Sequence, residues 1–338
     1  MKDQPFLKEV PVQEAVGLRL GHDLTRIVSG EFKGRAFRKG HIITAEDIPL
    51  LLDIGKEHIY IMDLPEGWVH EEDAALRMAQ AAAGDNVELS EPSEGKVVLK
   101  AAIPGLAKID ETFVHLANDI EHVVFSTIKT DVVVRSGASL AAARVVPLVV
   151  EETTVARFET TAQQHRYRTN AQPIVAVKPF RALKAGVVTT GGEVFTGRIE
   201  DKFGPVLKEK LAALGSEVVE QRFSADNTES IAEHIRYFQE KHVDLILVTG
   251  GMSVDPDDRT PGAIKRAGAD IVSYGTPMLP GSMMLFGYLP GGVPIFGLPG
   301  AVIYENFTSF DVLLPRVCAG ERIERADIVK LGYGGLLK

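Results

Sequence analysis

The last half of the chain holds four carboxylates in segments that are otherwise rich in glycine and hydroxyl side chains. They are Glu193, Asp226, Asp255 and Asp258. Carboxylates beside a phosphate group repel it unless a divalent cation lies between them, and Mg²⁺ commonly uses one or two carboxylates together with substrate oxygens. The grouping therefore suggests magnesium-assisted chemistry on an anionic ligand. The alternative for Asp226 and Asp258 is that each caps the helix that follows it, because Asp is a strong N-cap residue.

The same segments supply backbone amides and hydroxyl groups that suit a phosphate. Glycine permits a close approach of backbone to a ligand, although any single glycine also fits an ordinary tight turn. Taken together, these groups could cradle a phosphate without a cluster of arginines. No Walker A lysine motif or GxGxxG segment opens a helix, which disfavours the ordinary nucleotide folds. The groups concerned are Gly191, Gly192, Gly250, Gly251, Gly300, Thr189, Thr190, Thr249 and Ser253.

Strands and helices alternate through this part of the chain. Such alternation implies βαβ units, and hence a mainly parallel sheet with helices on both faces. In an open parallel sheet, ligands bind beyond the carboxyl ends of the strands, so the polar loops should meet at one edge. We expect strands at 185–191, 217–223, 243–251, 270–275, 283–289 and 293–299, and helices at 201–215, 227–242, 260–268 and 302–320.

Length and composition limit the class of protein. A chain of 338 residues exceeds what one hydrophobic core usually fills. The net charge of -9, with no long basic block, argues against nucleic-acid binding, and no apolar stretch is long enough to cross a membrane. The single Cys318 excludes an intramolecular disulfide, and the first residues lack the pattern of a secretory signal. We therefore expect a cytoplasmic protein.

Changes in composition divide the chain into three expected domains. Residues 1–70 read as a small mixed α/β domain. Residues 71–170 read as a strand-rich middle domain that begins with an Ala-rich helical stretch at 71–85 and has one or two short helices, and segment 153–164 is grouped with its strand-rich pieces. Residues 171–338 form the α/β domain described above. The strand-rich middle segment makes a homodimer one option.

Four linked motifs resemble the molybdopterin-binding domain. They are TTGGEVFTGRIEDKFGPVL (189–207), VDLILVTGGMSVDPDDRTP (243–261), the Pro-Gly of TPMLPGSMMLFG (276–287) and GLPGA (297–301). That domain is shared by molybdopterin molybdenumtransferases and molybdopterin adenylyltransferases, and the order of motifs is closest to the molybdenumtransferases. The resemblance implies a three-layer α/β/α domain that binds molybdopterin or its adenylated form.

The resemblance also implies roles for individual residues. Glu193, Asp226 and Asp258 would be the catalytic residues and would handle magnesium and molybdate. The molybdopterin ligand would contact Thr190, Gly191, Gly192, Thr249, Gly250, Gly251, Ser253, Asp255, Pro280, Gly281, Ser282, Pro299 and Gly300. For the pterin ring itself, Tyr274, Tyr288 and Phe296 are candidates for stacking, although aromatic residues beside strands more often belong to the core.

Three positions depart from the family pattern. Asp255 replaces the usual glycine after Ser-Val, Ser282 stands where a lysine commonly follows Pro-Gly, and Ala301 replaces an asparagine. An added aspartate and a missing lysine remove positive charge from the place where a pterin phosphate would lie. The first interpretation is therefore a molybdenumtransferase-like enzyme that assists Mg²⁺-dependent molybdate insertion. The alternatives are a non-catalytic carrier or maturation chaperone that serves a molybdoenzyme client, and a metal-dependent pyrophosphate hydrolase.

Overall fold

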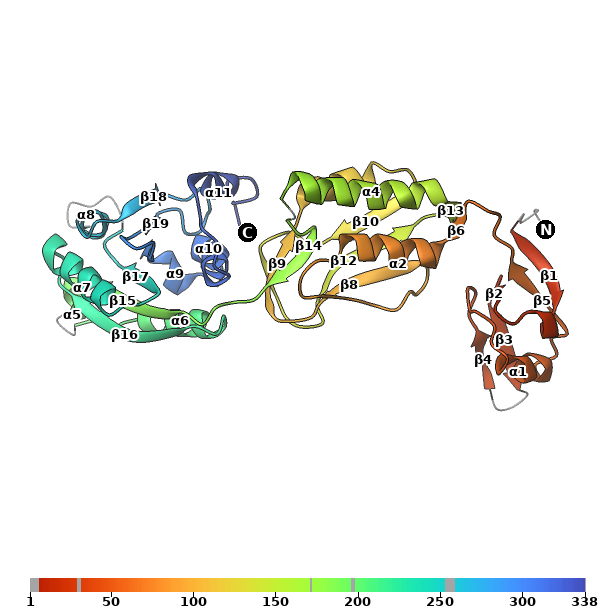
Figure 1. The fold of residues 1–338 in the computed structure, drawn as a ribbon. Helices are drawn as coiled ribbons and strands as arrows, with labels where there is room; N and C mark the ends of the chain where they lie inside the picture. Colours follow the sequence, from red (N-terminus) through yellow and green to blue (C-terminus); the bar gives the residue numbers. More distant parts are fainter. Residues whose placement is uncertain (1–5, 29–31, 171, 196–197, 253–258, 338) are drawn as a thin grey trace.

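The computed structural model describes residues 6–28, 32–170, 172–195, 198–252 and 259–337. Its hydrophobic side chains gather in separate cores, one formed by residues 10–61, one by residues 69–177, and two on opposite faces of a sheet formed by residues 185–331. The three parts lie in a row, with the N-terminal part and the C-terminal part at opposite ends of the middle part (Figure 1). Domain boundaries at residues 70 and 170 stay predictions.

The N-terminal part is a small α/β unit built on an antiparallel sheet in the order β1-β5-β2. Its helix begins where Asp47 accepts hydrogen bonds from the amide and the hydroxyl of Thr44, both at 2.9 Å. Gly55, with φ of 76°, follows the helix and turns the chain toward β5. The elements are β1 (Leu7–Pro11), η1 (Val12–Glu14), β2 (Arg19–Leu20), β3 (Leu24–Val28), β4 (Phe32–Phe37), α1 (Asp47–Asp53) and β5 (His58–Met62).

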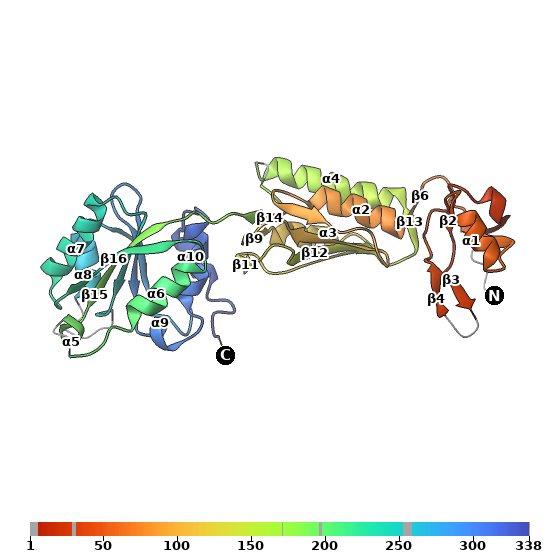
Figure 2. The same cartoon turned by 90° about the horizontal axis from the view of Figure 1, so that it is seen from below.

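The middle part packs helices against one face of an antiparallel sheet in the order β10-β12-β8-β7, and Figure 2 shows the helices on one side. A second sheet has the order β11-β9-β14, and β13 pairs with β6. The elements are β6 (Trp68–His70), α2 (Glu71–Ala82), β7 (Val87–Leu89), β8 (Lys96–Ala101), β9 (Gly105–Ile109), α3 (Glu111–Asn118), β10 (Val123–Thr127), β11 (Val132–Val134), β12 (Ser139–Val145), β13 (Val149–Glu151), α4 (Glu152–Arg168) and β14 (Val175–Lys178).

The expectation of strand structure in residues 153–164 is wrong, because this segment lies inside helix α4. Val155, Phe158 and Ala162 recur at helical spacing and are all buried. On the outer surface, Arg77 of α2 donates to Glu152 at 2.7 Å and to Glu159 at 2.8 Å, two residues that lie on the same side of α4. Tertiary packing and these ion pairs therefore override the strand preference of the threonines.

The C-terminal part contains the expected sheet, with six strands in the order β16-β15-β17-β20-β19-β18. β16, β15, β17 and β20 are parallel to one another, and β19 is antiparallel to both β20 and β18. All five residues of β17 are buried, as the apolar sequence predicts for a central strand. The strands are β15 (Lys184–Thr190), β16 (Glu217–Ser224), β17 (Leu245–Thr249), β18 (Asp270–Tyr274), β19 (Leu285–Tyr288) and β20 (Pro294–Leu298).

Helices cover both faces of this sheet. Buried side chains of α6 and α10 belong to the core on one face, and those of α7 and α8 to the core on the other. The resulting α/β/α arrangement is the predicted fold class. The helices are α5 (Gly192–Phe195), α6 (Phe203–Ala212), α7 (Thr228–Glu240), α8 (Thr260–Arg266), α9 (Ala301–Tyr304), α10 (Ser309–Cys318) and α11 (Arg325–Lys330).

The single final helix expected over 302–320 is instead two helices, α9 and α10. Thr308 is the N-cap of α10, with its amide and hydroxyl both donating to Asp311, at 2.8 and 2.9 Å. This reciprocal capping box starts a new helix and so interrupts the apolar periodicity. The break puts the N-terminus of α10 beside the loop that contains Gly281.

A network of charges joins the middle and C-terminal parts. Glu321, whose side chain is only 9% exposed, pairs with Lys108 at 2.8 Å, Lys178 at 2.9 Å and Arg316 at 2.8 Å. Burial alone would raise the pKa of Glu321, but these three cations lower it to about 2. Arg316 also pairs with Asp327 at 3.0 Å and with Asp131 at 3.7 Å. We call this set the interdomain clasp.

Candidate functional site

The carboxyl edge of the sheet has a topological switch point between β15 and β17. The chain leaves β15 through α6 to reach β16 on one side, and returns through α7 on the opposite face to β17 on the other side. Loops that leave two adjacent strands in opposite directions open a crevice, and ligands of open α/β sheets bind in that crevice. Thr189 lies opposite Thr249 in the pairing, so the loops after both strands start side by side.

Two threonine hydroxyls are buried at this point. Thr190 ends β15 and is 5% exposed, and Thr249 ends β17 and is fully buried. Within the described part of the chain, neither Oγ1 atom has a hydrogen-bond partner. A buried hydroxyl without a partner costs about 1–3 kcal/mol, so such groups usually meet a ligand or another polar group. The two strands therefore end in two buried hydroxyl donors at the switch point of the sheet.

Gly250 brings the loop after β17 against the end of β15. It has φ of 83°, and a Cβ at this position would lie 2.7 Å from the carbonyl oxygen of Thr190 and 2.8 Å from its Oγ1. Thr260, at the start of α8, holds the loop from the other side by donating its hydroxyl to the Gly250 carbonyl at 2.7 Å. Only glycine fits both the dihedral angle and the space. Gly251, with φ of 56°, continues this turn.

Asp226 links the loop after β16 to α5. Its Oδ2 accepts a hydrogen bond from the backbone amide of Gly192 at 2.7 Å, while Gly191 has φ of 134° just before the helix. The alternative that Asp226 caps the next helix is wrong, since Asn227 is the N-cap of α7 and accepts from Ser230 at 2.8 Å. Asp226 is exposed, and no described residue bonds its other oxygen, Oδ1.

Part of the predicted site lies beyond what the structure describes. Ser253, Asp255 and Asp258 fall in 253–258, outside the described residues, and only the backbone of Glu193 is described, as the second residue of α5. The residue that starts α8 as its N-cap is Arg259, which makes no side-chain capping bond. Among the described side chains, no group of three His, Cys, Asp or Glu has the arrangement of a metal site. The four acidic residues thus keep their predicted roles as hypotheses.

The Pro-Gly loop and the end of β20 complete the same edge. Gly281 has φ of 104°, and its carbonyl accepts from the Ser309 hydroxyl at 2.7 Å, which fixes Pro280 and Ser282 near the N-terminus of α10. The Ser282 carbonyl in turn accepts from the amide of Thr276 at 2.8 Å. Pro299 and Gly300 follow β20 directly, where Leu298 pairs with Thr249. The structure therefore brings the Thr190, Thr249, Pro280 and Gly300 loops to one edge.

Of the three aromatic candidates for stacking, two belong to the core. Phe296 is fully buried and Tyr288 is 8% exposed, with its hydroxyl accepting from the Ile323 amide at 2.7 Å. Tyr274 is 46% exposed at the carboxyl edge and donates its hydroxyl to the Met252 carbonyl at 3.0 Å. Tyr274 is therefore the aromatic side chain that lies beside the predicted site.

Sequence reasoning did not identify Thr260 or Gln221. Gln221 of β16 donates to the Thr189 hydroxyl at 2.8 Å and to Asp201 at 2.6 Å, while Asp201 accepts from the first amides of α6 at 2.9 and 3.0 Å. These contacts hold the ends of β15 and α6 together. No local motif marks them, because the partners are distant in the chain.

The family comparison agrees with this geometry. Residues 186–318 match the family model described as "Probable molybdopterin binding domain", and residues 9–63 match a domain of unknown function. The matched range begins within β15 and ends with α10, and it includes all the loops of the carboxyl edge. Over residues 186–318 the C-terminal part is thus similar to the molybdopterin-binding domain family.

Individual relatives match shorter segments. A CinA-like protein of Mycobacterium tuberculosis is 37% identical over 83 residues, which are 25% of this chain and 19% of that protein, and one of Mycobacterium marinum is 35% identical over 83 residues. The chain thus spans about a fifth of the length of these curated relatives.

Two solved structures show partial similarity to this chain. The molybdopterin biosynthesis enzyme MoaB of Thermus thermophilus is 24% identical to this chain, with a TM-score of 0.34. The match covers 41% of this chain and 98% of MoaB. The molybdopterin biosynthesis MoeA protein of Pyrococcus horikoshii is 15% identical, also with a TM-score of 0.34, and the match covers 94% of this chain and 75% of that protein.

In the described residues, no helix combines the length and apolarity needed to span a bilayer.

Proposed function

We propose that this protein acts in molybdenum cofactor biosynthesis by binding molybdopterin, or its adenylated form, at the carboxyl edge of the C-terminal sheet. The observation that carries the proposal is the pair of buried hydroxyls of Thr190 and Thr249 at the switch point. A phosphate oxygen of the ligand would accept from these donors and from the amides of the glycine loops. Because these donors are hydroxyl and amide groups, the proposed phosphate contact does not need a cluster of arginines.

The finer proposal is a molybdenumtransferase-like reaction that inserts molybdate. Mg²⁺ would be held by Glu193, Asp226 and Asp258 and would neutralise charge between the carboxylates, the phosphate and the entering molybdate. The Oδ1 of Asp226, to which no described residue donates, is of the hard oxygen type that this ion prefers, and the bond of Oδ2 to the Gly192 amide fixes the carboxylate beside α5. The protein's own contribution is to orient the phosphate through Thr190 and Thr249.

A non-catalytic carrier is the second candidate, and the three departures from the family pattern favour it. Ser282 in place of lysine and the additional Asp255 reduce the positive charge available to an anionic ligand. Such a protein would bind molybdopterin and pass the cofactor to a molybdoenzyme client without activating molybdate.

One assay separates the two functions. The purified full chain is incubated with adenylated molybdopterin, molybdate and Mg²⁺, and AMP release and active cofactor are measured. Turnover that is lost in Glu193→Ala and in Asp258→Ala, with melting temperatures close to wild type, supports the enzyme. Binding of the ligand without turnover supports the carrier. Absence of binding by the wild-type chain would rule out both.

The charge at position 282 gives an independent test. Ser282→Lys restores the cation that the family pattern has after Pro-Gly, and we expect molybdopterin to bind about tenfold more tightly to this variant. The control is Ser126→Lys, which adds the same charge at an exposed position of β10 in the middle part. Equal affinities of the wild-type, Ser282→Lys and Ser126→Lys chains would place the ligand elsewhere.

A further inference from the structure

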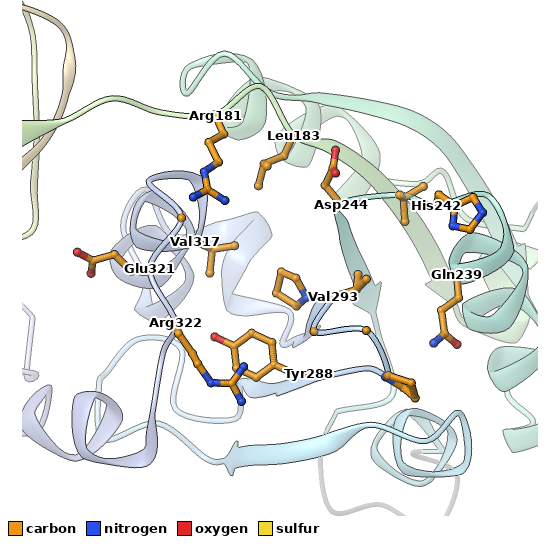
Figure 3. Close-up of a pocket in the computed structure, with 16 residues that line it drawn as sticks. Arg181, Leu183, Gln239, His242, Asp244, Tyr288, Val293, Val317, Glu321 and Arg322 are labelled. Atoms are coloured by element: carbon orange, nitrogen blue, oxygen red, sulfur yellow. The ribbon is translucent and has the colours of Figure 1, made fainter.

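A second cavity lies at the opposite, amino edge of the same sheet. It has a volume of about 580 Å³ and is formed where β15, β17 and β20 begin and where β19 ends (Figure 3). None of its lining residues belongs to the loops of the carboxyl edge. The molybdopterin site proposed above therefore does not account for this cavity.

The negative side chains of this cavity are already engaged. Glu321 points away from the middle of the cavity and is compensated by the three cations of the interdomain clasp. The carboxylate of Asp244 also points outward in Figure 3 and accepts from the Lys184 amide at 2.9 Å. The cavity therefore has little negative charge of its own to repel an anion.

Two guanidinium groups at the cavity have no carboxylate partner among the described residues. Arg181 lies against Gly320, where a Cβ would be 2.3 Å from its Cζ, so the glycine leaves the space that the guanidinium occupies. Arg322 lies over the ring of Tyr288, with its Cζ 4.6 Å from the ring centroid. Both groups are thus positioned by contacts that leave their N–H donors open.

Apolar side chains form much of the remaining wall. Leu183 and Val317 line it from the start of β15 and from α10, and Val293 from the turn before β20. Figure 3 shows Val317 and Val293 between the two arginines and His242. A ligand here would place an anionic group on the guanidinium groups and an apolar or planar body on these side chains.

We propose that the amino-edge cavity is a second binding site, which takes a small organic anion through Arg181 and Arg322. The oxyanion group is a phosphate ester or a carboxylate, since guanidinium recognises both through paired hydrogen bonds. The site is separate from the molybdopterin site, and because Glu321 precedes Arg322 it also borders the interdomain clasp.

The test uses the full chain and three probes: phenyl phosphate, benzoate and inorganic phosphate, each titrated by calorimetry. We expect one of the two aromatic anions to bind more tightly than inorganic phosphate, because only they reach the apolar wall. The better of the two identifies the oxyanion group. The double variant Arg181→Gln with Arg322→Gln should weaken that binding about a hundredfold, at about tenfold for each charge-assisted contact.

Two variants make the result specific. Arg135→Gln with Arg157→Gln removes the same charge from exposed positions of the middle part and should leave the affinity unchanged. Thr190→Val with Thr249→Val alters the carboxyl edge and should also leave it unchanged. The proposal is overturned if no aromatic anion binds, if the Arg181 and Arg322 variant binds like wild type, or if the threonine variant alone abolishes binding. A failure of this kind would leave the molybdopterin proposal standing.

Discussion

Among single residues, Thr190 and Thr249 matter most for the proposed ligand site. Their type and position could be predicted from the sequence, since each ends an apolar strand before a Gly-Gly pair. Their burial and their lack of described partners could not, because these depend on the pairing of strands that are distant in the chain. The same limit applies to Gln221 and Thr260, which have contacts but no motif.

Removing a buried hydroxyl should weaken the binding of molybdopterin without lowering the stability of the fold. Thr249→Val keeps the shape of the side chain and removes a buried donor that has no described partner. We expect the melting temperature to stay the same or rise, and the affinity for molybdopterin to fall about tenfold. Thermal melting and calorimetry measure the two effects, with Thr154→Val in α4 as the control. A clear drop in melting temperature would mean that the hydroxyl serves the fold rather than a ligand.

Gly250 offers a test of the close approach between the loops. Gly250→Ala should destabilise the protein by about 1–2 kcal/mol for the positive φ and by a further ~1–3 kcal/mol for the clash with Thr190. Gly215→Ala is a matched control, because φ there is 72° but nothing lies within 4 Å of the new Cβ. Denaturant unfolding compares the two. Equal losses of stability would contradict the tight packing of Gly250 on Thr190.

At the scale of elements, alternating apolar runs predicted the C-terminal strands and helices well, because βαβ units repeat one simple pattern. Two errors have local causes. The threonines of α4 imitate a strand, and the Thr308 capping box divides a periodic segment into α9 and α10. In both cases a side-chain contact outweighs the intrinsic preference of the residues.

The capping of α7 separates the structural role of Asn227 from the proposed metal-binding role of Asp226. Asn227→Ala removes the cap bond to Ser230 and should cost about 1 kcal/mol of stability, with little effect on turnover. The neighbouring Asp226→Ala should cost less stability, since this side chain is exposed, but should abolish turnover if Asp226 holds Mg²⁺. Urea unfolding and the AMP-release assay read the two effects. If Asn227→Ala lost turnover and Asp226→Ala kept it, Asp226 would not belong to the proposed metal site.

At the scale of the whole molecule, composition predicted several domains but not how they are joined. The interdomain clasp unites charges from β9, β14, α10 and the segment after α10, and no pattern in the sequence connects them. We propose three domains with boundaries near residues 70 and 170, and limited proteolysis should cut near these positions first.

The clasp should respond to acid in a defined range. The pKa of Glu321 is lowered to about 2 in the folded chain, from an ordinary value of 4.5. Because the pKa is lowered, the ion pairs stabilise the contact between the middle and C-terminal parts fully at pH values above about 4.5. This stabilisation is lost as the pH falls from about 4.5 toward about 2. Glu321→Gln should remove it at all pH values. The measurement is the radius of gyration by X-ray scattering from pH 7 to about pH 2.

The expected result is an increase in the radius for wild type as the pH falls through this range, and a larger radius for Glu321→Gln already at pH 7. Glu324→Gln is the control, because that exposed side chain is not part of the clasp. Identical radii for the wild-type and Glu321→Gln chains at pH 7 would show that the ion pairs do not hold the two domains together.

The position of bound molybdopterin is the decisive test of a ligand site at the carboxyl edge. In a crystal structure of the full chain with molybdopterin, we predict density for the terminal phosphate beyond the ends of β15 and β17, within hydrogen-bond distance of the Thr190 and Thr249 hydroxyls. Density for molybdopterin only at the amino-edge cavity, or at no part of the C-terminal sheet, would contradict the account.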